Sequence, residues 1–170
     1  MRLTTLKLKN FRGYRGETVV GFDDLTAFVG KNDVGKSTIL EALDIFFNDK
    51  NSVAKIEKGD INKQSQQDGD TDICISACFS ELPERIVIDS SNETSFSAEY
   101  LLNESSELEI VKKYPNGGTA KVYVRANHPK NPMCCDLLSK TNADLKKLLN
   151  EQHIDCDDRT KNACIRTAIW

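Results

Sequence analysis

The stretch Gly30-Lys31-Asn32-Asp33-Val34-Gly35-Lys36-Ser37 decides the interpretation of this sequence, because it fits the pattern G-x-x-x-x-G-K-S/T. The glycines let the backbone curl tightly, so that successive N–H groups point inward at an anion. A helix that begins near Lys36 adds its N-terminal dipole to the same anion site. The pattern therefore predicts a loop that holds the phosphates of a nucleotide.

Each side chain of this loop has an expected role. Lys36 reaches the β- and γ-phosphates as a compact cation, the Ser37 hydroxyl ligates Mg²⁺, and Thr38 helps to hold the α-phosphate side. ATP and Mg²⁺ are the expected ligand and cofactor. The expected nucleotide-binding residues of the loop are Gly30, Asn32, Asp33, Val34, Gly35, Lys36, Ser37 and Thr38. The alternative is a glycine-containing turn before a helix, with Lys36 merely solvated.

The flanking sequence predicts the elements that such a loop needs. Residues 25–29 (LTAFV) form a short apolar run typical of a buried strand, and residues 36–47 place apolar side chains at helical spacing. Upstream, residues 3–11 alternate as a strand does. Residues 17–22 are the predicted hairpin partner of that strand.

The remaining sequence divides into three stretches. Residues 48–72 are polar and are predicted to form an exposed loop. Residues 72–126 are predicted to form an antiparallel β subdomain, with a hairpin turn at Asn116-Gly117-Gly118. Its predicted strands are 72–80, 84–89, 95–101, 108–114 and 119–126.

The last stretch is predicted to be helical. Apolar residues at helical spacing favour helices over 136–152 and 158–169. We therefore expect a first segment at 1–126 and a helical segment at 127–170. The apolar ending Ala168-Ile169-Trp170 leads us to expect an N-terminal fragment of a larger protein.

Composition sets limits on the function. The net charge of -3 lacks the basic footprint that would argue directly for nucleic acid. No apolar run approaches the roughly 20 residues that span a membrane, and the N-terminus lacks a signal peptide. A cytoplasmic location without a membrane partner is therefore expected. The six cysteines are not a disulfide signal in that setting.

The first 48 residues are similar to those of a known group of ATPases. The opening Leu8-Lys9-Asn10-Phe11-Arg12 and the stretch from Gly30 to Leu43 resemble the RecF-like, SMC-like and overcoming-lysogenization-defect (OLD) families. Within this group, the stretch Phe79 to Pro83 looks most like the OLD endonucleases. The resemblance implies an α/β fold, namely the first lobe of an ABC-type ATPase with a mixed β core and an antiparallel β subdomain, followed by helices.

The same resemblance implies the activity and the partners. It implies an ATPase that hydrolyses ATP in a head-to-tail dimer or higher oligomer and associates with DNA, coupled to an endonuclease in antiphage defence or DNA processing. Arg12 becomes a candidate phosphate or adenine contact, with a solvated turn residue as the alternative. Two other functions stay open: a RecF/SMC-like repair or chromosome-maintenance ATPase without a nuclease, and a nucleotide sensor that never hydrolyses.

Several parts that such families use are missing from the pattern. An apolar strand ending in Asp-Glu is absent, since the run at 86–89 ends in Asp89 and is followed by serine. The Ser-Gly-rich signature helix is absent too, so the segment alone is expected to be inactive. The glutamine that senses the γ-phosphate is not decided among the candidates Gln64, Gln66, Gln67 and Gln152.

Three further sets of residues are weaker candidates. Asp60 is the best of the acidic residues after the helix for a metal or partner contact, although a solvated loop is the simpler interpretation. A metal cluster of Cys134, Cys135, His153 and Cys156 lacks the usual spacing. Basic residues on predicted strands are candidates for one DNA-facing sheet: Lys7, Lys9, Lys112, Lys113, Lys121 and Arg125.

Overall fold

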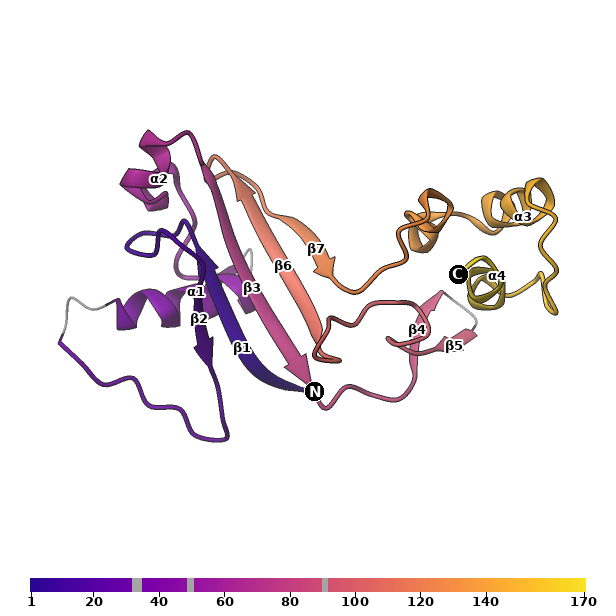
Figure 1. Cartoon of the computed structure of the whole chain (residues 1–170). Helices are drawn as coiled ribbons and strands as arrows, with labels where there is room; N and C mark the ends of the chain where they lie inside the picture. Colours follow the sequence, from indigo (N-terminus) through magenta and orange to yellow (C-terminus); the bar gives the residue numbers. More distant parts are fainter. Residues whose placement is uncertain (32–34, 49–50, 90–91) are drawn as a thin grey trace. The chain divides into compact units, whose positions relative to one another are not determined.

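The computed structural model describes residues 1–31, 35–48, 51–89 and 92–170 (Figure 1). The chain forms two compact units, each assembled from two stretches of sequence. The first contains residues 1–81 and 107–125, and the second contains residues 82–106 and 126–170. These units do not coincide with the expected segments 1–126 and 127–170, because residues 82–106 group with the C-terminal stretch.

The first unit is built on a five-stranded sheet in the order β2-β1-β3-β6-β7. All four pairings in this sheet are antiparallel. The α/β class, the antiparallel strands and the helices after them are therefore as predicted. The strands are β1 (Arg2–Lys9), β2 (Thr18–Gly21), β3 (Asp72–Ser80), β6 (Leu108–Pro115) and β7 (Lys121–Arg125).

One face of this sheet is the apolar core. Alternating residues of β1 and β3, among them Leu6, Leu8, Ile75 and Ala77, are fully buried. The helix α1 (Lys36–Asn48) packs on this face, and the Phe46 and Phe79 rings lie 6.4 Å apart. The helix that follows the predicted phosphate loop is thus fixed by sheet packing.

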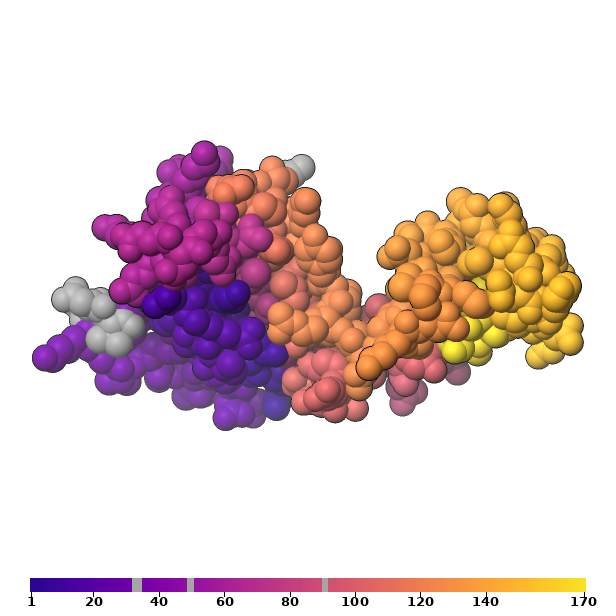
Figure 2. Space-filling model, turned by 45° about the horizontal axis from the view of Figure 1, so that its top comes forward, coloured from indigo at the N-terminus to yellow at the C-terminus, as the bar shows by residue number. Residues whose placement is uncertain are grey.

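The polar stretch after α1 is more ordered than the sequence suggested. It contains the 3-10 helix η2 (Lys58–Asp60) and the short helix α2 (Lys63–Gln67), and Ile61 is only 4% exposed. Asn10 holds it in place, because the Asn10 side chain accepts a hydrogen bond from the Asn62 N–H at 3.1 Å. Figures 1 and 2 show this stretch lying beside the end of β1. Residues 57–67 are therefore more ordered than the loop expected over 48–72, and Ile61 and Ser65 are buried, but most of their side chains are exposed as predicted.

The expected buried strand at residues 25–29 was also wrong. These residues form no strand, and the Leu25 and Val29 side chains are 89% and 94% exposed. A buried strand needs both a hydrogen-bonded neighbour and a covering layer. No strand in the described part of the chain pairs with residues 25–29.

The second unit combines a small hairpin with helices. The hairpin pairs β4 (Ile86–Asp89) with β5 (Asn92–Thr94), and Leu137, Leu145, Leu149, Ile165 and Ile169 form the core of the unit. Its helical elements are η3 (Pro132–Cys134), η4 (Leu137–Ser139), α3 (Asn142–Glu151) and α4 (Asn162–Ile169).

Three sequence predictions for the second unit need correction. Residues 95–101 form turns rather than a strand, because hydrogen bonds such as Leu101 N–H to Phe96 O bend the chain on itself. The helix predicted over 136–152 begins at Asn142, where Thr141 supplies a capping box. The helix predicted over 158–169 begins only at Asn162.

A buried ion-pair network joins the hairpin and the turn to α4. Arg166 is fully buried and donates two hydrogen bonds of 2.7 Å to the Glu99 carboxylate. A third, of 2.8 Å, reaches Asp89. Although burial opposes the charged form, the hydrogen bonds to Glu99 and Asp89 raise the pKa of Arg166 above its usual value. The guanidinium therefore stays charged inside the unit.

Replacing Arg166 with Met is expected to lower the free energy of unfolding by about 3–5 kcal/mol, because it leaves the Glu99 carboxylate buried without a counter-charge. Urea unfolding followed by circular dichroism measures this change. Lys147→Met is the control, since Lys147 pairs with Glu151 at 3.7 Å on the exposed surface of α3. That change should cost less than about 1 kcal/mol. Equal losses in the two variants would contradict a stabilising role for the network.

Candidate nucleotide-binding site

The predicted phosphate loop lies directly before α1, as the motif requires. Lys36 is the first residue of the helix, and the Ile39 N–H donates to the Gly35 carbonyl at 3.2 Å. The first turn of α1 contains no acidic residue that would repel an anion. Of the expected site residues, Asn32, Asp33 and Val34 lie outside the described residues.

Lys36 turns back over the loop. Its Nζ donates hydrogen bonds to the Gly30 carbonyl and, at 2.6 Å, to the Lys31 carbonyl. Lys36 therefore lies across the start of the loop and is not merely solvated. A bound phosphate could replace these two neutral carbonyls as the acceptor for the Lys36 ammonium group. Hydrogen bonds to a charged acceptor are stronger than those to a neutral one.

Gly35 is held by a residue that the sequence interpretation did not single out. Its φ angle is +85°, and a Cβ atom at this position would lie 2.8 Å from the Tyr14 Oη. The Tyr14 hydroxyl donates to the Gly35 carbonyl at 3.3 Å. Tyr14 lies 21 residues away in sequence, so only the fold brings it to the loop.

Ser37 and Thr38 complete the first turn of α1. Ser37 is exposed and Thr38 is half-buried. An exposed hydroxyl beside a lysine at a helix N-terminus could ligate the Mg²⁺ ion that accompanies a bound nucleotide. Lys36, Ser37 and Thr38 therefore fit a nucleoside triphosphate with its metal ion.

Arg12 is not a solvated turn residue. Its Nε donates to the Asp60 carboxylate at 2.8 Å, and its Nη1 donates to the carboxylate of Glu41 on α1. Burial opposes its charge, but the hydrogen bonds to Asp60 and Glu41 raise the pKa of Arg12. A cavity of about 260 Å³ lies beside it, lined also by Gly59, Ile61, Asn62, Lys63 and Gln64.

The other candidates for the phosphate site either form hydrogen bonds within the protein or belong to different parts of the fold. The Asp60 carboxylate accepts from Arg12 and from the Glu57 N–H, which is a structural role rather than that of an open metal ligand. Asp89 belongs to the Arg166 network of the second unit. Gln64, Gln66 and Gln67 lie in or beside α2 in the same unit as the loop, whereas Gln152 belongs to the other unit.

The six basic candidates for a DNA surface separate onto two faces of the sheet. Lys9, Lys113 and Lys121 lie in one row across β1, β6 and β7, with Cys74 of β3 between the first two. By the same pairing, Lys7 and Arg125 share their face. Lys112 lies on the opposite face, with its Nζ 5.4 Å from the Phe46 ring centroid. All six therefore lie on strands of one sheet, as expected, but Lys112 is on the face that packs against α1.

Carboxylates neutralise much of this basic face. Lys7 pairs with Glu109 at 2.8 Å, Lys9 with Asp70 at 3.2 Å, and Lys113 with Asp72 at 2.7 Å. Arg125 also pairs with Glu109, at 3.0 Å. The face thus carries ordered cations but little excess charge.

The cysteines show no metal-binding arrangement. No group of three or more His, Cys, Asp or Glu side chains able to hold a metal occurs among the described residues. Desolvation by burial is the main reason that the pKa of Cys78 rises to about 11, so this thiol is poorly reactive. Within the same described residues, no helix is long and apolar enough to cross a membrane.

Two solved structures are partly similar to this chain. One, described as "Structural biochemistry of ATP-driven dimerization and DNA stimulated activation of SMC ATPases", has a TM-score of 0.49 at 18% identity, over 91% of this chain and 81% of that one. The SMC head domain from Thermotoga maritima has a TM-score of 0.42 at 16% identity, over 88% of this chain and 51% of that one.

Curated relatives and a family model match the sequence itself. Structural maintenance of chromosomes protein 1 of Schizosaccharomyces pombe is 38% identical over 52 residues, 30% of this chain. Its counterpart in Caenorhabditis elegans is 35% identical over 57 residues, 33% of this chain. Each match spans only 4% of the relative's length. A model of the AAA ATPase domain matches residues 1–168, and the chain therefore belongs to the AAA ATPase domain family.

Proposed function

We propose that this chain binds ATP and Mg²⁺ and forms one half of a head-to-tail dimeric ATPase of the RecF/SMC-like type. One observation carries the proposal: the Lys36 ammonium lies over a glycine-bounded loop at the N-terminus of a helix. Such a loop offers backbone N–H groups, a helix dipole and a cation to the same anion.

Each described residue has a distinct part in this proposal. Lys36 binds the β- and γ-phosphates, the Ser37 hydroxyl ligates Mg²⁺, and Thr38 supports the α-phosphate side. Bound Mg²⁺ would neutralise charge on the phosphate oxygens. Tyr14 donates to the Gly35 carbonyl and leaves no room there for a Cβ atom. The Arg12 side chain, beside the cavity at Gly59 to Gln64, is proposed to contact a phosphate or the adenine.

Hydrolysis is proposed to need a second subunit. Phosphoryl transfer requires a positioned water and charge stabilisation around the γ-phosphate. In the described part of the chain, Asp60 and Asp89 are both held by arginine side chains and cannot serve as free metal ligands. A partner that supplies the missing groups would complete the site.

We propose two more specific functions for this ATPase. An OLD-type ATP-dependent endonuclease, in antiphage defence or DNA processing, is supported by the stretch Phe79 to Pro83 and the opening at Leu8 to Arg12. A chromosome-maintenance ATPase without a nuclease is supported by the similarity to two SMC proteins. Metal-dependent cleavage of plasmid DNA by the purified protein would favour the first over the second.

Replacing Lys36 with Ala is expected to weaken ATP binding by roughly 2–4 kcal/mol, because it removes a cation paired with phosphate in a partly desolvated site. Calorimetry with the 170-residue chain measures the affinity. Lys31→Ala is the matched control, since Lys31 contributes its carbonyl rather than its side chain to the Lys36 contact. Unchanged affinity in Lys36→Ala would exclude this loop as the nucleotide site.

The purified chain should hydrolyse ATP far more slowly than the roughly 1–100 s⁻¹ typical of kinases. The reason is that the groups which activate water and close the site are proposed to come from outside the described residues. A phosphate-release assay at saturating ATP tests this expectation. Turnover within the kinase range would show that this chain holds a complete catalytic site.

DNA is proposed to bind the dimer through the basic face of the sheet. A triple variant that combines Lys9→Ala, Lys113→Ala and Lys121→Ala should bind DNA with a weaker salt dependence. The slope of log affinity against log salt concentration should become shallower by roughly 0.9 for each DNA phosphate that a lysine no longer neutralises. Fluorescence anisotropy with a dimer closed by a non-hydrolysable ATP analogue measures this slope. Lys112→Ala is the control, since Lys112 lies on the opposite face. The same slope in both variants would remove this face from the DNA path.

A further inference from the structure

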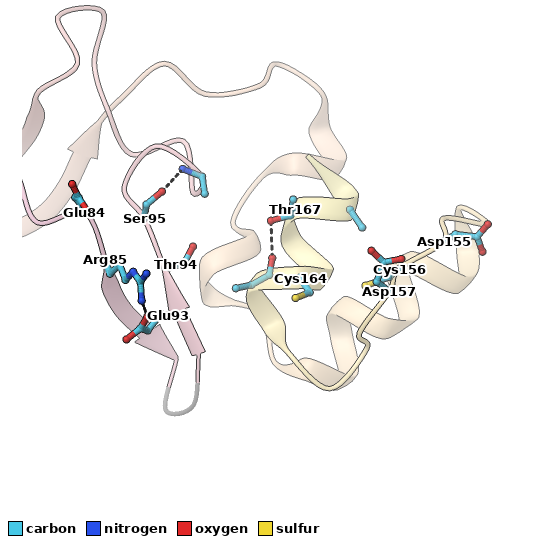
Figure 3. A pocket seen from close by; sticks show the side chains of 13 residues that line it. Glu84, Arg85, Glu93, Thr94, Ser95, Asp155, Cys156, Asp157, Cys164 and Thr167 are labelled. Carbon is cyan, nitrogen blue, oxygen red and sulfur yellow. Dashed lines mark hydrogen bonds and ion pairs between the residues drawn. The ribbon is translucent and has the colours of Figure 1, made fainter.

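The second unit contains a groove that the nucleotide chemistry does not use. It has a volume of about 630 Å³ and lies between the β4–β5 hairpin, the turn after β5, the loop at residues 155–157 and one side of α4 (Figure 3). All of its lining residues belong to this one unit. The volume falls within the range of roughly 300–1,000 Å³ of protein binding pockets.

The floor of the groove is made of small side chains. On α4, Ala163 and Thr167 form one row at i, i+4 spacing, and Cys164 and Ala168 form a second. Ala98 of the turn after β5 also lines the groove. Rows of small residues at this spacing leave a shallow channel along a helix, into which the ridge of a second helix fits.

The hydroxyl groups of the groove are already engaged within the protein. Thr94 donates to the Glu99 carboxylate at 2.9 Å, and Thr167 donates to the Ala163 carbonyl at 2.9 Å. The Ser95 Oγ accepts from the Ala98 N–H at 3.1 Å. The floor therefore offers apolar contact and few hydrogen bonds, which suits an apolar side chain better than a polar small molecule.

The rim of the groove is acidic. Glu84, Glu93, Asp155 and Asp157 line it together with a single basic residue, Arg85, and Arg85 is paired with Glu93 at 2.9 Å. Among the described residues, neither Asp155 nor Asp157 forms an ion pair. An uncompensated acidic rim repels nucleic acid and attracts Lys and Arg side chains.

We propose that this groove docks a basic amphipathic helix of a partner protein. The large apolar side chains of that helix fill the channel over Ala163, Cys164 and Ala168. Its lysine and arginine side chains reach Asp155, Asp157 and Glu84 on the rim. The proposal concerns only the second unit, so it does not depend on the proposed ATPase activity.

A synthetic helical peptide tests the proposal, with a leucine face flanked by lysines and a fluorescein label. Fluorescence anisotropy with the whole chain should detect binding that weakens with added salt. A peptide with glutamate in place of each lysine should bind at least about tenfold more weakly. Thr167→Trp fills the channel from an exposed helix position and should weaken the lysine peptide about tenfold.

Matched variants separate the groove from general charge attraction. Ala143→Trp places the same bulk on an exposed position of α3 and should leave binding unchanged. Asp155→Asn with Asp157→Asn should weaken binding several-fold, whereas Glu104→Gln with Asp136→Asn, two exposed acids outside the groove, should not. Equal effects of Thr167→Trp and Ala143→Trp, or of the two charge-neutralising pairs, would overturn the proposal, as would equal binding of the two peptides.

Discussion

The two-residue alternation of β1 and β3 is the constraint on which the first unit depends. Leu6, Leu8, Ile75 and Ala77 are fully buried on one face, and Lys7 and Lys9 of β1 fall on the other. The apolar face fixes α1, and the start of α1 places Lys36 against the loop. A one-residue slip would reverse both faces at once. The register of the sheet therefore also determines where α1 and Lys36 lie.

Much of this arrangement could be predicted from the sequence, because the signals are local. Alternation gave β1, β3, β6 and β7, helical spacing gave α1, and the glycine pattern gave the position of Lys36. Contacts made at a distance were not predictable. Tyr14 reaches Gly35 across 21 residues, and the Arg12 side chain is held by acids 29 and 48 residues away. The spacing of residues in the sequence does not predict these long-range contacts.

The two wrong strand predictions share one cause, namely that an apolar or alternating run does not show which segment it will pair with. Residues 25–29 look like a buried strand but have no strand beside them in the described sheet. Residues 95–101 alternate but close on themselves as turns. Conversely, residues 57–67 lack large apolar runs, yet Asn10 and Arg12 fix them through hydrogen bonds. Tertiary partners override local preference in each case.

The discontinuous second unit has a consequence for the order of folding. Arg166 meets Asp89 and Glu99 across 77 and 67 residues, which are costly loops to close in an unfolded chain. The β6–β7 hairpin sets Glu109 opposite Arg125, so the chain enters this hairpin and leaves it at neighbouring points. Once this hairpin forms, residues 107–125 no longer contribute a free loop. The sheet thereby shortens the effective contact order of the second unit and favours a sequence of events in which the sheet forms first.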